Sequence, residues 1–91
     1  MILHAIVTAY IATGHPCSDG RMPVVGRTVA VPRSVPLGSV VVINGHRYLA
    51  QDHTARRFDG RFDIFTDTKQ HAVSWGKHKL IVTIFTPRHR K

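Results

Sequence analysis

Two aspartates in the second half of the chain carry the strongest signal for chemistry. Asp52 and Asp63 are eleven positions apart, and each interrupts a run of residues that is otherwise typical of a buried strand. Asp63 stands between Phe62 and Ile64, where partial burial is expected to raise the pKa of its carboxyl group. A carboxyl group that stays protonated near neutral pH can act as a general acid. Two carboxyl groups, one donating a proton and one stabilising charge, are typical of glycosidic cleavage.

Each aspartate also has a purely structural interpretation. Asp63 could pair with Arg61 or with a loop amide, and structural ion pairs perturb a pKa as well. Asp52, which we expect at the end of a strand, could form an Asx-turn that shapes the following loop. Either aspartate alone favours the structural interpretation, but the pair in an otherwise basic chain favours the catalytic one.

Three further residues are candidates for contacts with a substrate. Thr8 and Tyr10 lie on one face of an alternating strand, where their hydroxyls can bond a carboxylate or a sugar. Core packing is the better expectation for Tyr10. His53 is adjacent to Asp52 and can tune it or carry a proton, although a solvated loop position is the simpler expectation.

Positive charge dominates the composition, with 13 Lys and Arg against 5 Asp and no Glu, a net charge of +8. Such a chain favours polyanions, whether nucleic acid, teichoic acid or an acidic glycan. Arg56 and Arg57 predict a solvated basic edge that can also hold the carboxylates of a peptide stem or glycan. The spacing of the seven histidines and of Cys17 does not suit a zinc site, so we expect no metal and no cofactor.

The elements that must position these residues are mostly short strands. Alternating or continuous apolar runs predict six of them, at residues 2–10, 28–31, 39–43, 46–50, 61–66 and 79–85. Asn44-Gly45 predicts a type I′ hairpin turn, and residues 11–26 predict a long loop. A single helix is expected at 68–75, capped by Asp67 with Gln70 and ended by Gly76, with Trp75 anchoring it to the core. The pattern indicates one all-β domain, a small closed barrel over residues 1–86, with a basic tail at 87–91.

Six segments occur in an order that is informative as a set: VTAY (7–10), MPVVGRTVAV (22–31), VPLG (35–38), AQD (50–52), GRFDIF (60–65) and AVSWG (72–76). This set resembles the three-aspartate (3D) domain. That domain is similar to the C-terminal part of the membrane-bound lytic transglycosylase A family and, more distantly, to rare lipoprotein A and the expansins. The resemblance covers roughly residues 6–85.

The resemblance implies a six-stranded double-psi β-barrel with one short helix that acts on peptidoglycan glycan strands. Asp63 matches the catalytic acid/base of the family, Asp52 matches the aspartate that shapes the site, and Thr8 matches a threonine of the expansin-like relatives. The implied reaction gives a 1,6-anhydro product from N-acetylmuramic acid. Three segments depart from the family. Pro32 replaces an aspartate, residues 53–57 replace a glycine pair, and residues 17–20 replace a turn of small residues, to which we assign no chemistry.

Three functions are compared on this basis. The leading hypothesis is a lytic transglycosylase or a related glycoside hydrolase, and the first alternative is a non-catalytic module that binds or loosens the cell wall. A basic barrel that binds nucleic acid is less expected, because the strands are short and few aromatic residues are exposed. The N-terminal residues have no basic region or cleavage site, and no apolar run approaches about 18 residues. We therefore expect no signal peptide and no membrane insertion. We also expect a monomer that is encoded by a phage and acts on the cell wall after release or from a virion.

Overall fold

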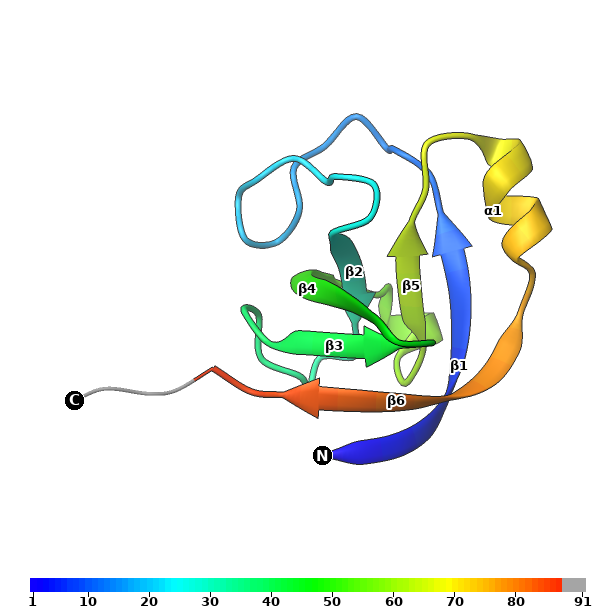
Figure 1. The fold of residues 1–91 in the computed structure, drawn as a ribbon. Helices are drawn as coiled ribbons and strands as arrows, with labels where there is room; N and C mark the ends of the chain where they lie inside the picture. Colours follow the sequence, from blue (N-terminus) through cyan, green and yellow to red (C-terminus); the bar gives the residue numbers. More distant parts are fainter. Residues whose placement is uncertain (88–91) are drawn as a thin grey trace.

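The computed structural model describes residues 1–87, so the expected basic tail, apart from Pro87, lies outside the described residues. Residues 1–87 form six strands, one 3₁₀ turn and one α-helix (Figure 1). In order these are β1 (Ile2–Tyr10), β2 (Thr28–Val31), β3 (Val40–Ile43), β4 (His46–His53), η1 (Arg56–Phe58), β5 (Phe62–Phe65), α1 (Lys69–Trp75) and β6 (His78–Phe85).

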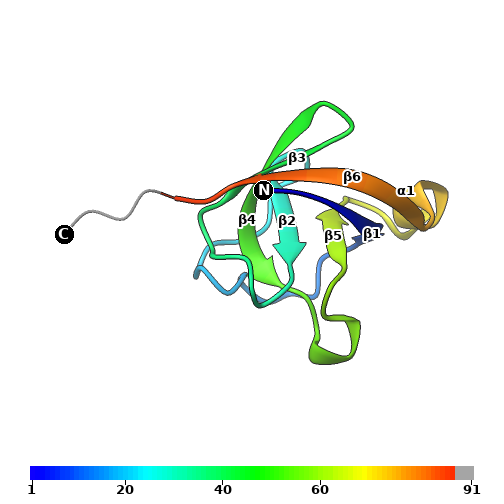
Figure 2. The ribbon, with the colours of Figure 1, turned by 90° about the horizontal axis from the view of Figure 1, so that it is seen from below.

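The six strands close into a barrel in the order β1-β5-β2-β4-β3-β6. Two neighbouring pairs are parallel, β1 with β5 and β2 with β4, and the other four are antiparallel. Figure 2 shows β4, β2 and β5 beside one another in this order. The single helix α1 lies outside the barrel beside β1 (Figure 1). The closed six-stranded barrel with one short helix, expected from the sequence, is confirmed.

Alternate residues of the strands point into the barrel and make its core. This alternation follows from the pleat of a strand, which sends successive side chains to opposite faces. The buried cluster contains Ala5, Val7, Val29, Val31, Val35, Val41, Ile43, Tyr48, Ala50, Phe62, Ile64, Val82 and Ile84. Trp75 packs against this cluster from α1, as predicted. The residues between the inward ones, including Thr8, Ala30 and Asp63, therefore face outward.

The turn between β3 and β4 agrees with the prediction, and the cap of α1 does not. Asn44 and Gly45 both have positive φ, 51° and 76°, as a type I′ turn requires. The N-cap of α1 is Thr68, whose hydroxyl oxygen accepts a hydrogen bond from the amide of His71. Asp67 instead contacts the His71 ring, so the predicted cap was wrong by one residue.

Strand β4 is longer than predicted because it contains an irregularity. Val29 is opposite Ala50, but the next residue of β2, Ala30, is opposite Asp52. Gln51 is therefore an extra residue, a β-bulge, and the residues after it are turned to the other face. Asp52 shares the outer face with Ala30 as a result. The prediction that β4 ends at residue 50 was wrong, because a bulge breaks the period of two on which it relied.

The core predicts a strong contrast between two phenylalanines. Phe62 is fully buried and Phe85 is 57% exposed. Phe62→Ala is expected to lower the free energy of unfolding by about 3–5 kcal/mol, because it leaves a cavity in the barrel. Phe85→Ala is the matched control and should change it by about 0.5 kcal/mol. Urea denaturation measures both values, and similar losses would contradict the proposed packing of the barrel.

Candidate active site

The two candidate aspartates lie in one row across the outside of the barrel. Asp63 in β5 is opposite Thr8 on one side and Ala30 on the other, and Ala30 is in turn opposite Asp52 in β4. Neighbouring strands lie about 4.8 Å apart, so the Cα atoms of the two aspartates, two strands apart, are separated by roughly 9–10 Å. Ala30, between them, is almost fully buried and has the smallest side chain of the row. Residues from four strands thus meet at one level of the barrel.

This row borders a surface cavity of about 250 Å³. The cavity combines both aspartates with hydroxyl, imidazole and apolar side chains. Its lining residues are Tyr10, Thr13, Ala30, Asp52, His53, Thr54, Ala55, Phe58 and Asp63. The fold therefore brings both predicted aspartates, Tyr10 and His53 to a single site.

Asp63 has the environment expected of a general acid. Burial raises the pKa of its carboxyl group, while the hydrogen bond from Thr8 and the positive charge of Arg61 partly oppose this rise. The Thr8 hydroxyl donates to Asp63 Oδ1 over 2.5 Å. Within residues 1–87 the carboxylate is thus hydrogen-bonded to Thr8, and no ion pair joins it to Arg61. The predicted direction of the pKa shift is confirmed.

Asp52 is held in place by the loop between β1 and β2. Its Oδ1 accepts hydrogen bonds from the Ser18 amide at 3.0 Å, from the Ser18 hydroxyl at 2.6 Å and from the His53 amide at 2.9 Å. Asp52 is the second-last residue of β4, close to the end of the strand as expected, and it is tied to a residue 34 positions earlier. These contacts fix the orientation of the carboxylate relative to the cavity.

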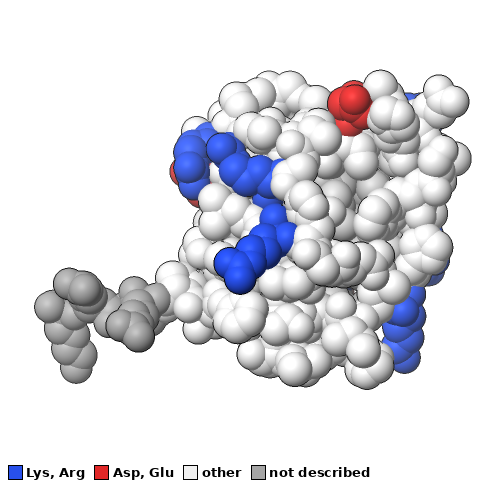
Figure 3. All heavy atoms as spheres, viewed as in Figure 1, with Lys and Arg blue, Asp and Glu red and all other residues white. Residues whose placement is uncertain are grey.

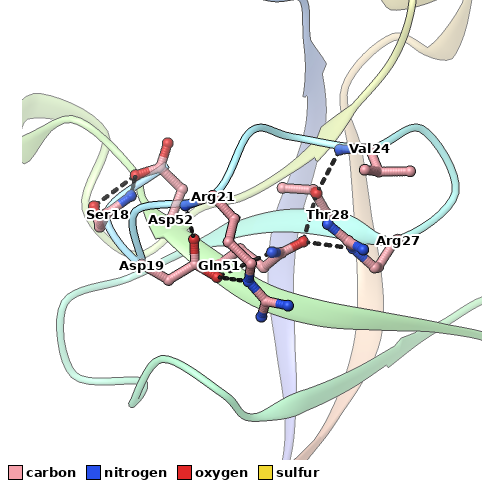
Figure 4. A network of polar contacts seen from close by, with 8 residues as sticks. All are labelled: Ser18, Asp19, Arg21, Val24, Arg27, Thr28, Gln51 and Asp52. Carbon is pink, nitrogen blue, oxygen red and sulfur yellow. Dashed lines mark hydrogen bonds and ion pairs between the residues drawn. The ribbon is translucent and has the colours of Figure 1, made fainter. Parts of the chain in front are cut away.

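The side chain of the bulged Gln51 is fully buried and anchors the same loop (Figure 4). Its Nε2 donates to Asp19 Oδ2 over 2.9 Å, and its Oε1 accepts from Thr28 Oγ1 at 2.7 Å and from Arg27 Nε at 3.0 Å. Thr28 Oγ1 also accepts from the amide of Val24 at 2.8 Å. One amide side chain thus joins the loop to β2 and β4 directly beside Asp52.

Sequence reasoning found no role for the turn that contains Ser18 and Asp19, and it did not single out Gln51. No local signal identifies these contacts, because Ser18 and Asp52 are 34 positions apart and Asp19 and Gln51 are 32 apart. A glutamine that follows an apolar strand and precedes a candidate catalytic aspartate was the one available hint. The structure shows that this turn supports the site.

Comparison with protein-family models, curated proteins and solved structures found no match for this chain. The interpretation of the site therefore rests on its geometry and on its chemistry.

Tyr10 combines packing with a position at the cavity. Its ring lies edge-on to Phe65, with centroids 5.4 Å apart and an interplanar angle of 65°. Burial, with smaller contributions from Cys17, Asp52 and Asp63, raises the pKa of its hydroxyl well above the usual range. The Tyr10 ring packs as expected. Its hydroxyl stays neutral as a hydrogen-bond donor and lies close to both carboxylates.

His53 differs from its predicted setting. It is the last residue of β4, it is half-buried, and its Nε2 is 3.3 Å from the carbonyl oxygen of Val35. The prediction of a solvated loop was therefore wrong, because the bulge extends the strand to this residue. His53 nevertheless lines the cavity, and its role toward a substrate stays a prediction.

Arg56 and Arg57 are exposed on η1, as expected of a basic edge, and do not line the cavity. The guanidinium carbon of Arg57 lies 4.8 Å from the centroid of the Phe58 ring. Because Phe58 does line the cavity, Arg57 is near its rim. Binding of a substrate by these arginines stays a prediction.

A second cavity, of about 170 Å³, is lined by Asn44, Trp75, His78 and Leu80. It contains no carboxylate, so it does not suit acid chemistry. Within residues 1–87 no group of three or more His, Cys, Asp or Glu side chains could hold a metal ion. None of the helices in the same residues has the length and hydropathy that a membrane span requires.

The buried amide of Gln51 gives a test of the loop anchor. Gln51→Leu is expected to lower the free energy of unfolding by about 1–3 kcal/mol, because it leaves buried polar partners unpaired. The matched control is Gln70→Leu, at an exposed position of α1, where little change is expected. Thermal and urea unfolding of both variants would show the difference, and equal stability would argue against an anchoring role.

Proposed function

We propose that this protein cleaves peptidoglycan glycan strands as a lytic transglycosylase, with Asp63 as the acid and base and Asp52 as its helper. One observation carries the proposal. The two carboxylates lie in one row at one cavity, and the half-buried Asp63 has a raised pKa. A carboxyl group whose pKa is raised by burial and that lines a cavity is a candidate for a catalytic role. The resemblance to the three-aspartate domain supports the substrate class.

The chemistry starts at the glycosidic oxygen between N-acetylmuramic acid and N-acetylglucosamine. Protonated Asp63 donates its proton to this oxygen while the bond to C1 of the muramic ring breaks. The positive charge that develops on this ring is stabilised by the nearby carboxylate of Asp52. The 6-hydroxyl of the same ring then attacks C1 and returns a proton to Asp63. One product strand ends in a 1,6-anhydro-N-acetylmuramic acid, and the other begins with a free N-acetylglucosamine. Asp63 is protonated again at the end of the reaction.

The contacts of Asp52 support a role in charge stabilisation. Strand β2, with Ala30, lies between the strands that carry the two aspartates. Three hydrogen bonds, from the Ser18 amide, the Ser18 hydroxyl and the His53 amide, hold Asp52 Oδ1 in place. A carboxylate fixed in this way can serve as a stationary negative charge beside the sugar ring.

The charge of the surface suits an anionic wall. Figure 3 shows Lys and Arg side chains gathered on one side of this face, whereas large parts of the face carry no charge. Arg21 and Arg27 belong to the loop between β1 and β2, which also holds Asp52 through Ser18. Cations in this loop would attract the carboxylates of the muramic acid and of the peptide stems.

The same charge, +8, favours a second function, a wall-binding module without cleavage. Such a module would bind insoluble peptidoglycan in a pull-down and release no soluble fragments. Mass spectrometry of the supernatant after incubation with sacculi distinguishes the two functions, because only the transglycosylase releases 1,6-anhydromuropeptides.

Replacement of the acid provides the main test. Asp63→Asn keeps the size of the side chain but removes its proton, so release of anhydromuropeptides should fall by about 10²- to 10⁴-fold. Asp67→Asn removes an equal charge at an exposed position outside the cavity and should keep the parent activity. If Asp63→Asn releases as much product as the parent, Asp63 is not the acid.

The hydrogen bond from Thr8 predicts a change in pH dependence. This bond lowers the pKa of Asp63, so its loss in Thr8→Val should raise that pKa further. Because the acid must be protonated, activity falls as the pH rises through this pKa. The alkaline limb of the pH–rate profile should therefore move to higher pH in Thr8→Val.

The matched control for this change is Thr83→Val, in β6 and outside the cavity. It should keep the alkaline limb of the parent. A shift of the Thr8→Val limb to lower pH would contradict the assigned role of the hydrogen bond.

A further inference from the structure

Apolar side chains form a continuous patch on the outside of one side of the barrel. Strand β3 pairs with β4 and β6, and β6 also pairs with β1, so the outward residues of these four strands are neighbours. Thr83 of β6, for example, is opposite Val42 on one side and Ile2 on the other. We call the outward apolar residues of this patch the apolar face. They are Ile2, Val40, Val42, Leu49, Ile81 and Phe85.

Three side chains of the apolar face are well exposed. Ile2 is 71% exposed, and Ile81 and Phe85 are each 57% exposed. Single exposed apolar side chains are common, whereas contiguous exposed patches are typical of surfaces that bind a partner. Figure 3 shows broad uncharged areas on the side of the molecule where Figure 1 shows β3 and β6. The apolar face is therefore a candidate for a binding surface.

The rim of the apolar face carries positive charge. Arg47 is exposed and directly opposite Val42, and Lys79 is exposed on the same side of β6, two residues before Ile81. Residues 88–91, with the sequence RHRK, add three cations shortly after the end of β6. None of the five aspartates of the chain belongs to β1, β3 or β6. The apolar face thus combines aliphatic and aromatic side chains with positive charge only.

We propose that the apolar face binds the surface of an anionic phospholipid membrane. Its exposed side chains enter the boundary between headgroups and acyl chains, while Arg47 and Lys79 lie among the lipid phosphates. Attachment of this kind is confined to the surface of the bilayer and requires no membrane span. The inference does not depend on the proposed cleavage of peptidoglycan.

Charge complementarity favours an anionic lipid surface over other occupants. A second copy of this chain carries the same net charge of +8 and the same positive rim, so association of two apolar faces would meet repulsion. Nucleic acid would match the rim but not the aliphatic side chains, because bases stack on aromatic rings. A membrane that contains acidic lipids matches both the apolar side chains and the cations.

The apolar face and the aspartate cavity lie on opposite sides of the barrel. In the closed order of six strands, β5 and β2 are across from β3 and β6. Asp63 and Ala30, which line the cavity, belong to β5 and β2. A protein bound through the apolar face would therefore leave the cavity accessible on the side away from the membrane.

The first experiment compares the parent protein on two kinds of vesicle. One kind contains phosphatidylcholine alone, and the other contains phosphatidylcholine with phosphatidylglycerol. Cosedimentation should show binding to the acidic vesicles at least about 10-fold tighter, because each Lys or Arg near an acidic surface contributes roughly a 5-fold gain. Added salt should weaken this binding without abolishing it, because salt screens charges and not apolar contacts. Absence of binding to the acidic vesicles overturns the proposal.

Two variants separate the contributions of the apolar side chains and of the rim. The double variant Ile81→Thr, Phe85→Thr keeps residues that suit a strand and should lower affinity for acidic vesicles by at least about 10-fold, because two apolar contacts with lipid are lost. Lys79→Gln should lower it by roughly 5-fold. The melting temperatures of both should stay close to that of the parent, because all three positions are exposed.

The matched controls are Val73→Ser and Lys69→Gln, at exposed positions of α1 that do not belong to the apolar face. The first should bind acidic vesicles as the parent does, and the second should lose less affinity than Lys79→Gln. Equal losses in Lys69→Gln and Lys79→Gln, with no loss in the double variant, would show attraction by net charge alone and overturn the apolar face.

Sedimentation equilibrium without lipid tests the competing occupant. The parent is expected to be a monomer. A parent dimer that the double variant disrupts, without binding of either form to acidic vesicles, would assign the apolar face to a second copy and overturn the proposal. Release of anhydromuropeptides from sacculi is measured separately, so a protein that binds acidic vesicles but cleaves nothing retains the membrane surface and loses only the proposed activity.

Discussion

The bulge at Gln51 is the constraint on which the rest of the site depends. Without an extra residue in β4, the alternation of the strand would place residue 52 opposite Val31 and direct it into the core. A lone carboxylate there would be severely destabilising. The bulge moves Asp52 to the outer face, level with Asp63, and the buried Gln51 amide ties the long loop to the barrel. A single insertion thus sets the direction of one aspartate and places the loop that orients it.

The two aspartates are supported in different ways, and this difference underlies the proposed division of their roles. Asp63 is half-buried and contacts one hydroxyl, that of Thr8, so the loss of solvent dominates its pKa. Asp52 accepts three hydrogen bonds at one oxygen, two of them from Ser18. An acid that gives up and regains a proton benefits from the first environment, and a fixed negative charge benefits from the second.

Most of the barrel could be predicted from the sequence, because its signals are local. The alternation in residues 2–10, the apolar run at 28–31 and the Asn44-Gly45 turn each depend on neighbouring residues only, and the structure agrees with all three. The prediction failed at the end of β4, where the bulge changes the alternation of the strand. It also failed at the start of α1, where Asp67 and Thr68 are both suitable N-cap residues. In the site, Asp63 and Thr8 could be predicted from burial and alternation. The support from Ser18 and Gln51 could not, since it arises from contacts more than thirty positions apart.

The pairing of β1 has a consequence for how the protein gains its site during folding. This strand is hydrogen-bonded to β5 and β6, and its partners lie about 55 to 80 residues further along the chain. Contacts of such long range form slowly, because the chain loses the entropy of a large loop before the contacts can stabilise the closed state. The Thr8–Asp63 bond and the cavity therefore form only when the barrel closes, and a nascent chain lacks them until β5 has been made. Folding and the appearance of the site are expected to be one cooperative event.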